Sequence, residues 1–299
     1  MMAYTKKQIS LSFVLGGNSP EAVSPTFADT GANKADIPPG LRISCHVAKT
    51  ASPAINLCEI RVFGLPPTIY NQLTAIYNIT QQAMRNTVIV KAGDETGMAT
   101  VFIGQINIAQ IDLNQQPDAV LNIIAQSALM QNLTPADPTP YPNSFNAAIA
   151  LEDLADKMKM DFENNGVSVM VPRMTLTGPF SKQALQIAEA AKINLAFDDT
   201  TMVIFPKGGS RVLQPVVKMS AQDGMIGYPA FGTHGIGVRC LYNPSIKWGG
   251  KIQLASSLKT PNLNGNWTVY ELSHTLESEM PDGKWETQFQ AQNWEALAP

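Results

Sequence analysis

The sequence predicts a mainly β protein with an α/β insert, in which two β-barrel domains flank a small α/β domain. In several short segments, apolar and polar residues alternate with period two, as in strands buried on one face. Glycine, proline and asparagine separate these segments. Between Ser144 and Ala191, apolar residues instead recur at helical spacing. At 299 residues the chain is long enough for two or three domains.

Residues 1–128 are expected to form the first barrel, with strands at Gln8–Leu15, Leu41–Val47, Asn56–Phe63, Thr87–Ala92, Met98–Leu113 and Asp118–Gln126. Residues 16–40, rich in glycine, proline and alanine, predict a long loop. Residues 67–82 predict a short helix, because proline is tolerated in a first helical turn and apolar residues then recur at helical spacing. A closed or nearly closed barrel would remove exposed sheet edges.

Residues 129–213 predict the α/β insert. The four prolines between Leu129 and Asn143 indicate a stiff connector. Ser144 is expected to cap a helix whose apolar face extends to Phe162 and which ends at Asn165-Gly166. The insert is then completed by a strand, a helix and a hairpin, expected at Val167–Val171, Ser181–Ala191, and Asn194–Phe197 with Met202–Phe205.

Residues 214–299 predict the second barrel. One side of an alternating run carries Ile236, Val238, Cys240 and Tyr242, and Ile252 and Leu254 resume the same period after a turn. Asn264-Gly265 predicts a tight hairpin before a strand at Trp267–His274. Asp282-Gly283 predicts another before Trp285–Gln292. The pattern is that of an antiparallel sheet with one buried face.

The segments GMIGYPAFGTHGIGVRCLYNPSIKWGGKIQL, NGNWTVYELSHTLES and GKWETQFQAQ resemble the last domain of the baseplate hub proteins of contractile-tailed phages. These are related to the late-control-D proteins and to the tube-like half of VgrG in type VI secretion. LRISCHVAKTASPAINLCEIRVFGLPPTIYNQL is similar to the first tube domain of that family, and VIVKAGDETGMATVFIGQI to its next hairpin. Asp94 departs from the family, in which an aromatic residue often follows the glycine.

The resemblance covers nearly the whole chain and implies a structural protein of the phage tail with two tube-protein-like barrels per chain. It implies a homotrimer that forms a pseudo-sixfold ring, joins the hexameric tail tube to the threefold spike, and lets DNA pass through its lumen without specific binding. The partners implied are the tail tube and spike proteins, with the tape measure and baseplate wedge proteins. Such a late protein would act in genome ejection, reside in the virion baseplate, and be assembled in the host cytoplasm.

Two other functions stay open at this point. The first is a hexameric distal-tail or tube-adaptor protein, which would also lack catalysis. The second is a tail-associated cell-wall hydrolase. The number of copies in the assembly separates the first alternative from the hub, and a zymogram tests the second.

Composition excludes several classes of protein. A formal net charge of -3 with 15% charged residues argues against a broad basic face for nucleic acid. No apolar run approaches the roughly 20 residues of a membrane span, so we expect no membrane insertion by this chain. The odd count of Cys45, Cys58 and Cys240, without CxxC spacing, predicts buried thiols in a reducing compartment.

No catalytic, cofactor-binding or metal-binding residue is expected, and the chain is predicted not to be an enzyme. Gly232–Gly237 is glycine-rich but leads into a strand, whereas a dinucleotide loop needs a helix N-terminus. Lys207–Ser210 lacks the spacing of a phosphate-binding loop and is read as a linker. The histidines His46, His234 and His274 are too far apart in sequence to suggest a metal site.

Two further groups of residues have the types that catalysis uses but lack the pattern that it needs. Ser257, His274 and Asp282 have the residue types of a catalytic triad, but no GxSxG elbow supports a nucleophile. The carboxylate pairs Asp198-Asp199 and Glu277 with Glu279 are expected in turn-like or exposed settings, where nothing would raise a pKa. The methionines of the insert are expected to fill its core: Met158, Met160, Met170 and Met174.

Overall fold

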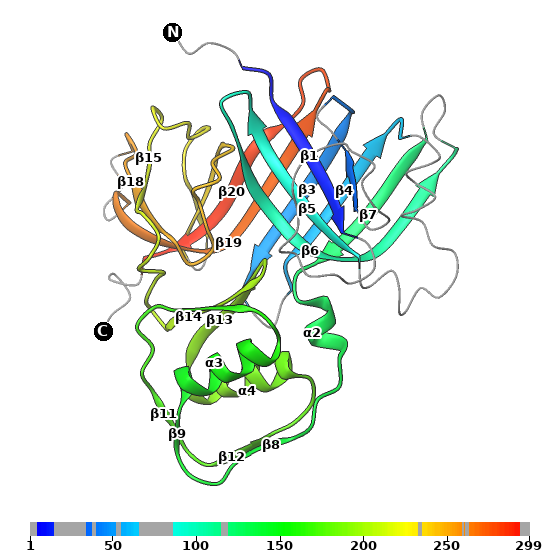
Figure 1. The fold of residues 1–299 in the computed structure, drawn as a ribbon. Helices are drawn as coiled ribbons and strands as arrows, with labels where there is room; N and C mark the ends of the chain where they lie inside the picture. The colour runs from blue at the N-terminus through cyan, green and yellow to red at the C-terminus, as the bar shows by residue number, and fades with distance from the viewer. Residues whose placement is uncertain are drawn as a thin grey trace. The chain divides into compact units, whose positions relative to one another are not determined.

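The computed structural model describes residues 5–14, 34–37, 40–51, 55–65, 86–114, 119–232, 235–258, 260 and 263–293 (Figure 1). The chain forms two compact units. The first unit consists of Met1–Ala48, Leu57–Leu129 and His274–Glu286, and the second of Lys49–Asn56, Met130–Ser273 and Thr287–Pro299. Of the residues that the structure describes, 51% lie in strands and 12% in helices, which confirms the mainly β fold class.

The first unit is built on an antiparallel sheet of β1 (Gln8–Val14), β2 (Lys34–Ile37), β3 (Ile43–Thr50), β4 (Leu57–Phe63), β5 (Thr87–Asp94), β6 (Gly97–Asp112) and β7 (Val120–Gln126). The strand order is β2-β1-β5-β6-β7-β4-β3. Alternate side chains of β3 and β4 are fully buried, as predicted: Ile43, Cys45, Val47, Cys58, Ile60 and Val62. The buried residues of β3 and β4 therefore recur with a period of two, as in strands that are buried on one face.

One expectation for residues 1–128 is partly wrong, and another falls outside the described residues. The long loop predicted at 16–40 is wrong at Lys34–Ile37, which forms β2 and pairs with β1 from Leu11↔Ile37 to Val14↔Lys34. Four residues paired on one side are too short to show a strand period in the sequence. Residues 16–33 lie outside the described residues, and so does the predicted helix at 67–82.

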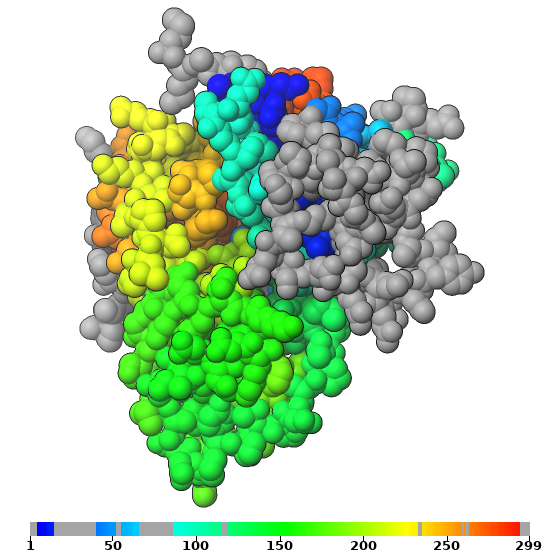
Figure 2. Space-filling model, in the orientation of Figure 1, coloured from blue at the N-terminus to red at the C-terminus, as the bar shows by residue number. Residues whose placement is uncertain are grey.

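The α/β part of the second unit contains three described helices, two of which contact a small sheet. Its elements are α2 (Leu129–Leu133), β8 (Thr139–Tyr141), β9 (Phe145–Asn146), α3 (Ala147–Lys157), β10 (Asp161–Asn164), β11 (Met170–Val171), β12 (Met174–Leu176), α4 (Phe180–Ala191), β13 (Ile193–Asp198) and β14 (Thr201–Pro206). The strands β10, β14 and β13 form one sheet, in which β10 and β14 are parallel. The hairpin predicted across Asp198–Thr200 is therefore present. This part is green in Figure 2.

The first helix of this part differs from its prediction. Asn146, not Ser144, caps α3: its Oδ1 accepts a hydrogen bond from the Ala148 N–H at 2.9 Å. The helix ends at Lys157, because Lys159 adopts a left-handed backbone with φ 56° and the chain turns into β10, where Phe162 lies. The predicted stiff connector contains α2 and β8. Met158 and Met160 are buried as expected, but Met170 is 59% exposed.

The β-rich part of the second unit consists of β15 (Val217–Met219), β16 (Ala230–Gly232), β17 (Gly235–Leu241), β18 (Lys251–Leu254), β19 (Gly265–Ser278) and β20 (Trp285–Gln292). Their order is β15-β18-β19-β20-β17-β16. The last residues of β19 and the first of β20 belong to the first unit. The core lies between these strands and includes Ile236, Val238, Cys240, Ile252, Trp267, Val269 and Phe289. The predicted inward face of this sheet is thus the buried one, except that Tyr242 follows β17 and is half-buried.

One predicted hairpin is wrong in this part. Leu254 pairs with Gly265, so ten residues connect β18 to β19 and Asn264-Gly265 is not a two-residue turn. Asn264 instead closes that connection by hydrogen bonds to the backbone of Ser256. Asp282, with φ 54°, does lie in the turn between β19 and β20, where Gly283 N donates to Met280 O. The same dipeptide chemistry that makes hairpin turns also ends longer loops.

The division of the chain into domains 1–128, 129–213 and 214–299 stays a proposal. The two compact units place the β-rich and α/β parts of residues 130–273 together, and segments near the C-terminus contribute to both units.

Candidate functional site

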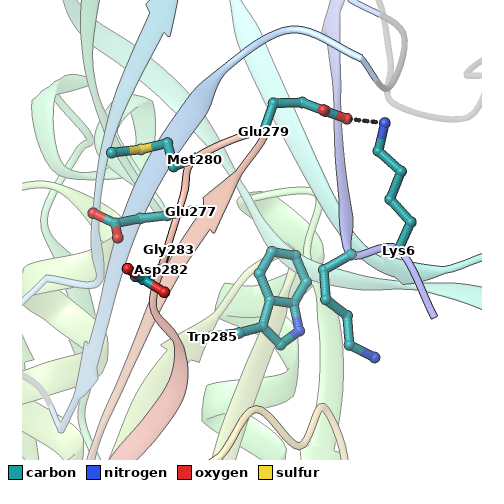
Figure 3. A pocket seen from close by; sticks show the side chains of 8 residues that line it. Lys6, Glu277, Glu279, Met280, Asp282, Gly283 and Trp285 are labelled. Carbon is teal, nitrogen blue, oxygen red and sulfur yellow. Dashed lines mark ion pairs between the residues drawn. The ribbon is translucent and has the colours of Figure 1, made fainter. Parts of the chain in front are cut away.

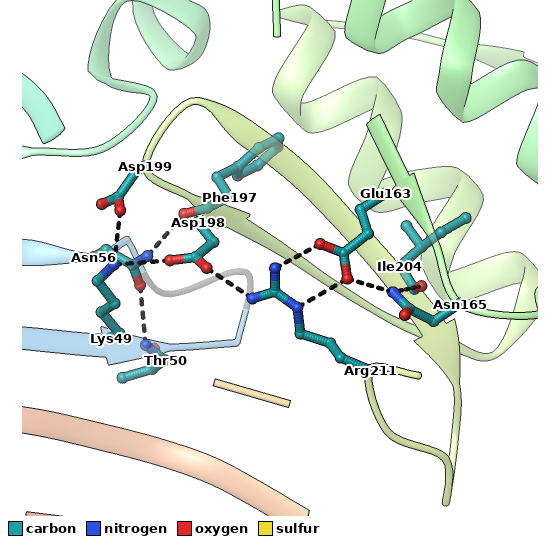
Figure 4. Close-up of polar contacts among 10 residues, drawn as sticks. All are labelled: Lys49, Thr50, Asn56, Glu163, Asn165, Phe197, Asp198, Asp199, Ile204 and Arg211. Carbon is teal, nitrogen blue, oxygen red and sulfur yellow. Dashed lines mark hydrogen bonds and ion pairs between the residues drawn. The ribbon is translucent and has the colours of Figure 1, made fainter. Parts of the chain in front are cut away.

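The second unit contains a cluster of buried charges, shown in Figure 4. We call Lys49, Glu163, Asp198, Asp199 and Arg211 the ionic cluster. Lys49 comes from the end of β3, Glu163 from β10, and Asp198 from the end of β13. Asp199 lies in the turn before β14, and Arg211 follows that strand by five residues. Segments distant in sequence thus bring three carboxylates and two cations together.

The contacts of the ionic cluster form a chain of ion pairs. Lys49 Nζ lies 2.8 Å from Asp198 Oδ1 and 3.0 Å from Asp199 Oδ2. The other oxygen of Asp198, Oδ2, accepts from Arg211 Nη1 at 2.7 Å. Arg211 also donates through Nε to Glu163 Oε1 at 2.9 Å and through Nη2 to Glu163 Oε2. The guanidinium therefore holds Glu163 with the paired geometry of a bidentate contact.

Burial and ion pairing have opposite effects on the pKa values of these side chains. Burial opposes ionisation of Lys49, but Asp198 and Asp199 outweigh it and raise the pKa of Lys49 above its ordinary 10.5. Burial likewise opposes the charge of Asp198, yet Lys49 and Arg211 hold its pKa well below the ordinary 3.8. The pKa of Glu163 is also lowered, because hydrogen bonds from Arg211 and Asn165 outweigh its burial. The cluster is therefore ionised at neutral pH.

Two asparagines bracket the ionic cluster. Asn56 accepts from Thr50 N at 3.0 Å and donates to Phe197 O at 2.7 Å. Asn165 donates to Glu163 Oε1 at 2.9 Å and accepts from Val212 N at 2.8 Å. These bonds fix the backbone on both sides of the charged side chains. Because the carboxylates are ionised and paired with cations, the arrangement suits a structural connection better than proton transfer.

The setting expected for Asp198 is right about the turn but wrong about exposure. Asp198 is only 9% exposed, whereas the sequence suggested a turn-like or exposed carboxylate. Its pKa is lowered and not raised, because the cations of Lys49 and Arg211 come from segments distant in the chain. Local sequence carries no signal for such a partner. Glu279 is exposed and has φ 55°, as expected for a turn, whereas Glu277 is half-buried within β19, which differs from the expectation.

A polar hollow of about 410 Å³ lies at the hairpin between β19 and β20 in the first unit (Figure 3). Lys6 pairs with Glu279 there, and Glu277 accepts from Lys284 N at 2.8 Å. Asp282 and Trp285 also line the hollow. Carboxylates and lysines line the same hollow. Charges of both signs are therefore mixed there, and they are not arranged as the acid, base and nucleophile of a catalytic site. Throughout the described part of the chain, no three His, Cys, Asp or Glu side chains could jointly hold a metal ion.

The described residues weighed as chemistry differ in their burial and in the unit to which they belong. His46 is exposed and its Nδ1 lies 3.2 Å from Thr275 Oγ1, whereas His274 is 4% exposed. His234 lies outside the described residues. Ser257 belongs to the second unit, and His274 and Asp282 belong to the first.

The glycine-rich segments and cysteines follow their predictions. Gly232 pairs with Gly235 where β16 turns into β17, so these glycines border a strand hairpin. Lys207–Ser210 forms a turn after β14 and continues into the linker. Cys45, Cys58 and Cys240 are buried thiols that are not joined in disulfides, and the sulfur atoms of Cys45 and Cys58 lie 3.6 Å apart. In the described regions, no helix has the length and apolar character needed to cross a bilayer.

Comparison with known proteins decides the family. The sequence model described as baseplate hub gp41 matches residues 23–285. The chain belongs to the baseplate hub gp41 family. This is a family of phage tail proteins, so the resemblance drawn from the sequence is confirmed. A search of curated protein sequences finds no match.

Solved structures support the same fold. A tail protein from Neisseria meningitidis MC58 is similar with a TM-score of 0.61 and 8% identity, covering 95% of this chain and 96% of its own. The 43 kDa tail protein of prophage MuSo2 from Shewanella oneidensis gives 0.61 and 9%, covering 98% and 99%. The E. coli c3393 protein, a type VI secretion component, gives 0.58 and 9%, covering 85% and 74%. At such low identities the similarity shows the fold alone.

Proposed function

We propose that this baseplate hub protein forms a homotrimer in which two tube-like barrels per chain build a pseudo-sixfold ring. The ring joins the hexameric tail tube to the threefold spike. The observation that carries the proposal is the match of the hub family over residues 23–285. The described strands include a 13-stranded sheet, and each compact unit contains six or more of its strands, which is consistent with two strand-rich parts in one chain.

The physical reason for this assembly is a match of symmetry. A closed ring of three copies presents three equivalent surfaces. If each copy carries two similar barrels, the ring presents six near-equivalent surfaces to a hexameric tube and three to a spike. DNA passes through the lumen without specific binding, because the chain carries a net charge of -3 and no dedicated basic face. A strongly positive lumen in a density map of the ring would contradict this last point.

The remaining parts of the proposal follow from that role. The chain is a structural protein and not an enzyme, and it contacts the tail tube, the spike, the tape measure and baseplate wedge proteins. It is a late protein of contractile tails that acts in genome ejection. It resides in the virion baseplate and is assembled in the host cytoplasm. The similarity of its fold to tail and type VI secretion proteins supports these partners.

The number of copies tests the proposal directly. Mass photometry of the purified chain, and of tails that contain it, should give three copies per ring. Six copies would support the hexameric tube-adaptor instead, and an image with one barrel per copy would also refute the hub geometry. A zymogram against cell walls should show no band; a band abolished by His274→Ala would favour the hydrolase.

A further inference from the structure

A groove of about 380 Å³ lies on the outer face of the strands β17, β19 and β20 in the second unit. Side chains alternate between the faces of a strand, so Val238 and Phe289 point into the core. Their neighbours Arg239 and Gln288 are exposed on the opposite face. The groove is therefore a feature of the solvent side of the sheet, and its volume falls in the range of small-ligand sites.

The floor and one wall of the groove suit a flat ligand. Gly237 has no side chain, and a Cβ placed there would meet only the carbonyl oxygen of Ala230, at 4.0 Å. Tyr228 lines the groove and is 63% exposed, although a tyrosine ring is largely apolar. The bare backbone thus leaves room beside an accessible aromatic ring.

Polar side chains at the other wall are already held in place. Tyr270 donates its hydroxyl hydrogen to Gln290 Oε1 at 2.6 Å, and Gln290 Nε2 donates to Glu271 Oε2 at 2.7 Å. The amide of Gln290 therefore has a fixed orientation, with a second N–H available by its chemistry. Preorganised donors and acceptors lower the cost of ordering a bound polar ligand.

The lining chemistry selects the class of ligand. Six of the ten lining residues carry polar side chains: Tyr228, Arg239, Glu271, Ser273, Gln288 and Gln290. The two charged ones, Arg239 and Glu271, have opposite signs, so the lining has no net charge. A phosphate would lack the excess of cations it needs, and an organic cation would meet Arg239. A lipid tail would leave too many polar groups without partners.

We propose that this groove binds a neutral oligosaccharide. One apolar face of a sugar ring lies against Tyr228, above the backbone of Gly237. The amides of Gln288 and Gln290 and the carboxylate of Glu271 exchange hydrogen bonds with its hydroxyl groups. This binding role goes beyond joining the tube to the spike, and it does not depend on the number of copies in the ring.

Titration calorimetry of the full chain with N-acetylglucosamine tetramer and with maltotetraose tests the proposal. At least one should bind, and Tyr228→Ala and Gly237→Val should each weaken it by about tenfold or more. Valine at position 237 fills the groove and suits a strand. Phe231→Ala is the matched control, because Phe231 is 62% exposed, lies three residues away and is not among the lining residues. It should change the affinity by less than about twofold.

Several outcomes would overturn the inference. They are an absence of binding to both saccharides, unchanged binding in Tyr228→Ala, or an equal loss in Phe231→Ala. A change in copy number without saccharide binding would assign the groove to a protein contact instead. If Gly237→Val fails to fold, Tyr228→Ala still decides, since its exposed ring contributes little to the core. Mass photometry of the same samples reports the hub geometry separately, so the two proposals fail independently.

Discussion

Lys49 and Asp198 are 149 positions apart in the sequence, yet Lys49 Nζ and Asp198 Oδ1 lie 2.8 Å apart. The side chains are 2% and 10% exposed, so the pair is almost closed to water. Asp198 also accepts from Arg211, which in turn binds Glu163. A single carboxylate therefore ties the end of β3 to the α/β part of the second unit.

Replacing Lys49 by methionine should lower the free energy of unfolding by about 3–5 kcal/mol, because removing one partner leaves a buried charge without its neighbour. Chemical denaturation of the purified chain measures the change. Lys157→Met is the control: Lys157 and Asp153 form an exposed pair at 2.7 Å, and its loss should cost about 1 kcal/mol or less. Equal losses in the two variants would show that burial adds nothing to the Lys49 pair.

Acid should remove the contribution of the ionic cluster. The folded pKa values of Asp198 and Glu163 are lowered from 3.8 and 4.5, so their stabilisation is present above the unfolded values. It is lost as the pH falls from about 4.5 through 3.8 toward the folded values. The free energy of unfolding, measured between about pH 2 and pH 7, should fall less steeply in Asp198→Asn than in the parent. Identical slopes would contradict the lowered pKa of Asp198.

Gly249→Ala should destabilise the second unit by about 2–3 kcal/mol. Gly249 has φ +74°, and a Cβ there would lie 2.7 Å from Cε1 of Phe205. Phe205 packs against Trp248, with ring centroids 5.0 Å apart, so the ring has little room to move. Thermal and urea unfolding measure the loss.

Gly227→Ala is the matched control for that variant. Gly227 has nearly the same backbone, φ +73°, but nothing lies within 4 Å of its Cβ position. Only backbone strain remains, so the cost should be about 1 kcal/mol. A similar loss at both glycines would mean that the contact with Phe205 contributes nothing.

Asn146→Ala should destabilise the protein by about 1 kcal/mol, since its side chain caps α3 through the Ala148 N–H. Ser144→Ala should stay within about 0.5 kcal/mol, because Ser144 is exposed and precedes the cap by two residues. Urea unfolding of the two variants measures both effects. The opposite ranking would restore the cap expected from the sequence.

Much of the fold could be predicted because strands buried on one face carry their own period. The buried set of β3 and β4 and that of β17 were read correctly from alternation alone. The edge strand β2 could not be predicted in this way, because a strand of four residues that is paired on one side needs no apolar face. The start of α3 was misplaced because Ser144 and Asn146 are both good caps, and only the backbone decides between them.

The ionic cluster shows where the sequence stops being informative. Asp198-Asp199 has the composition of a turn, and it does form one between β13 and β14. Asp198 pairs with Lys49, which lies on a segment far away in the chain. No local sequence pattern indicates this partner. The resemblance to the hub family rests on long segments that occur in the same order along the chain. No single residue carries a chemical signature of a hub protein.

The composition of the first unit has a consequence for its synthesis. That unit ends at Leu129 in its second segment and resumes only at His274, so 144 residues (273 minus 129) are translated in between. At roughly 5–20 residues per second this takes about 7–29 s on the ribosome. Throughout that interval β3 waits for β19, its neighbour on one side, with an open edge. The nascent chain thus carries a strand with one open edge, which can pair wrongly until the end of β19 emerges.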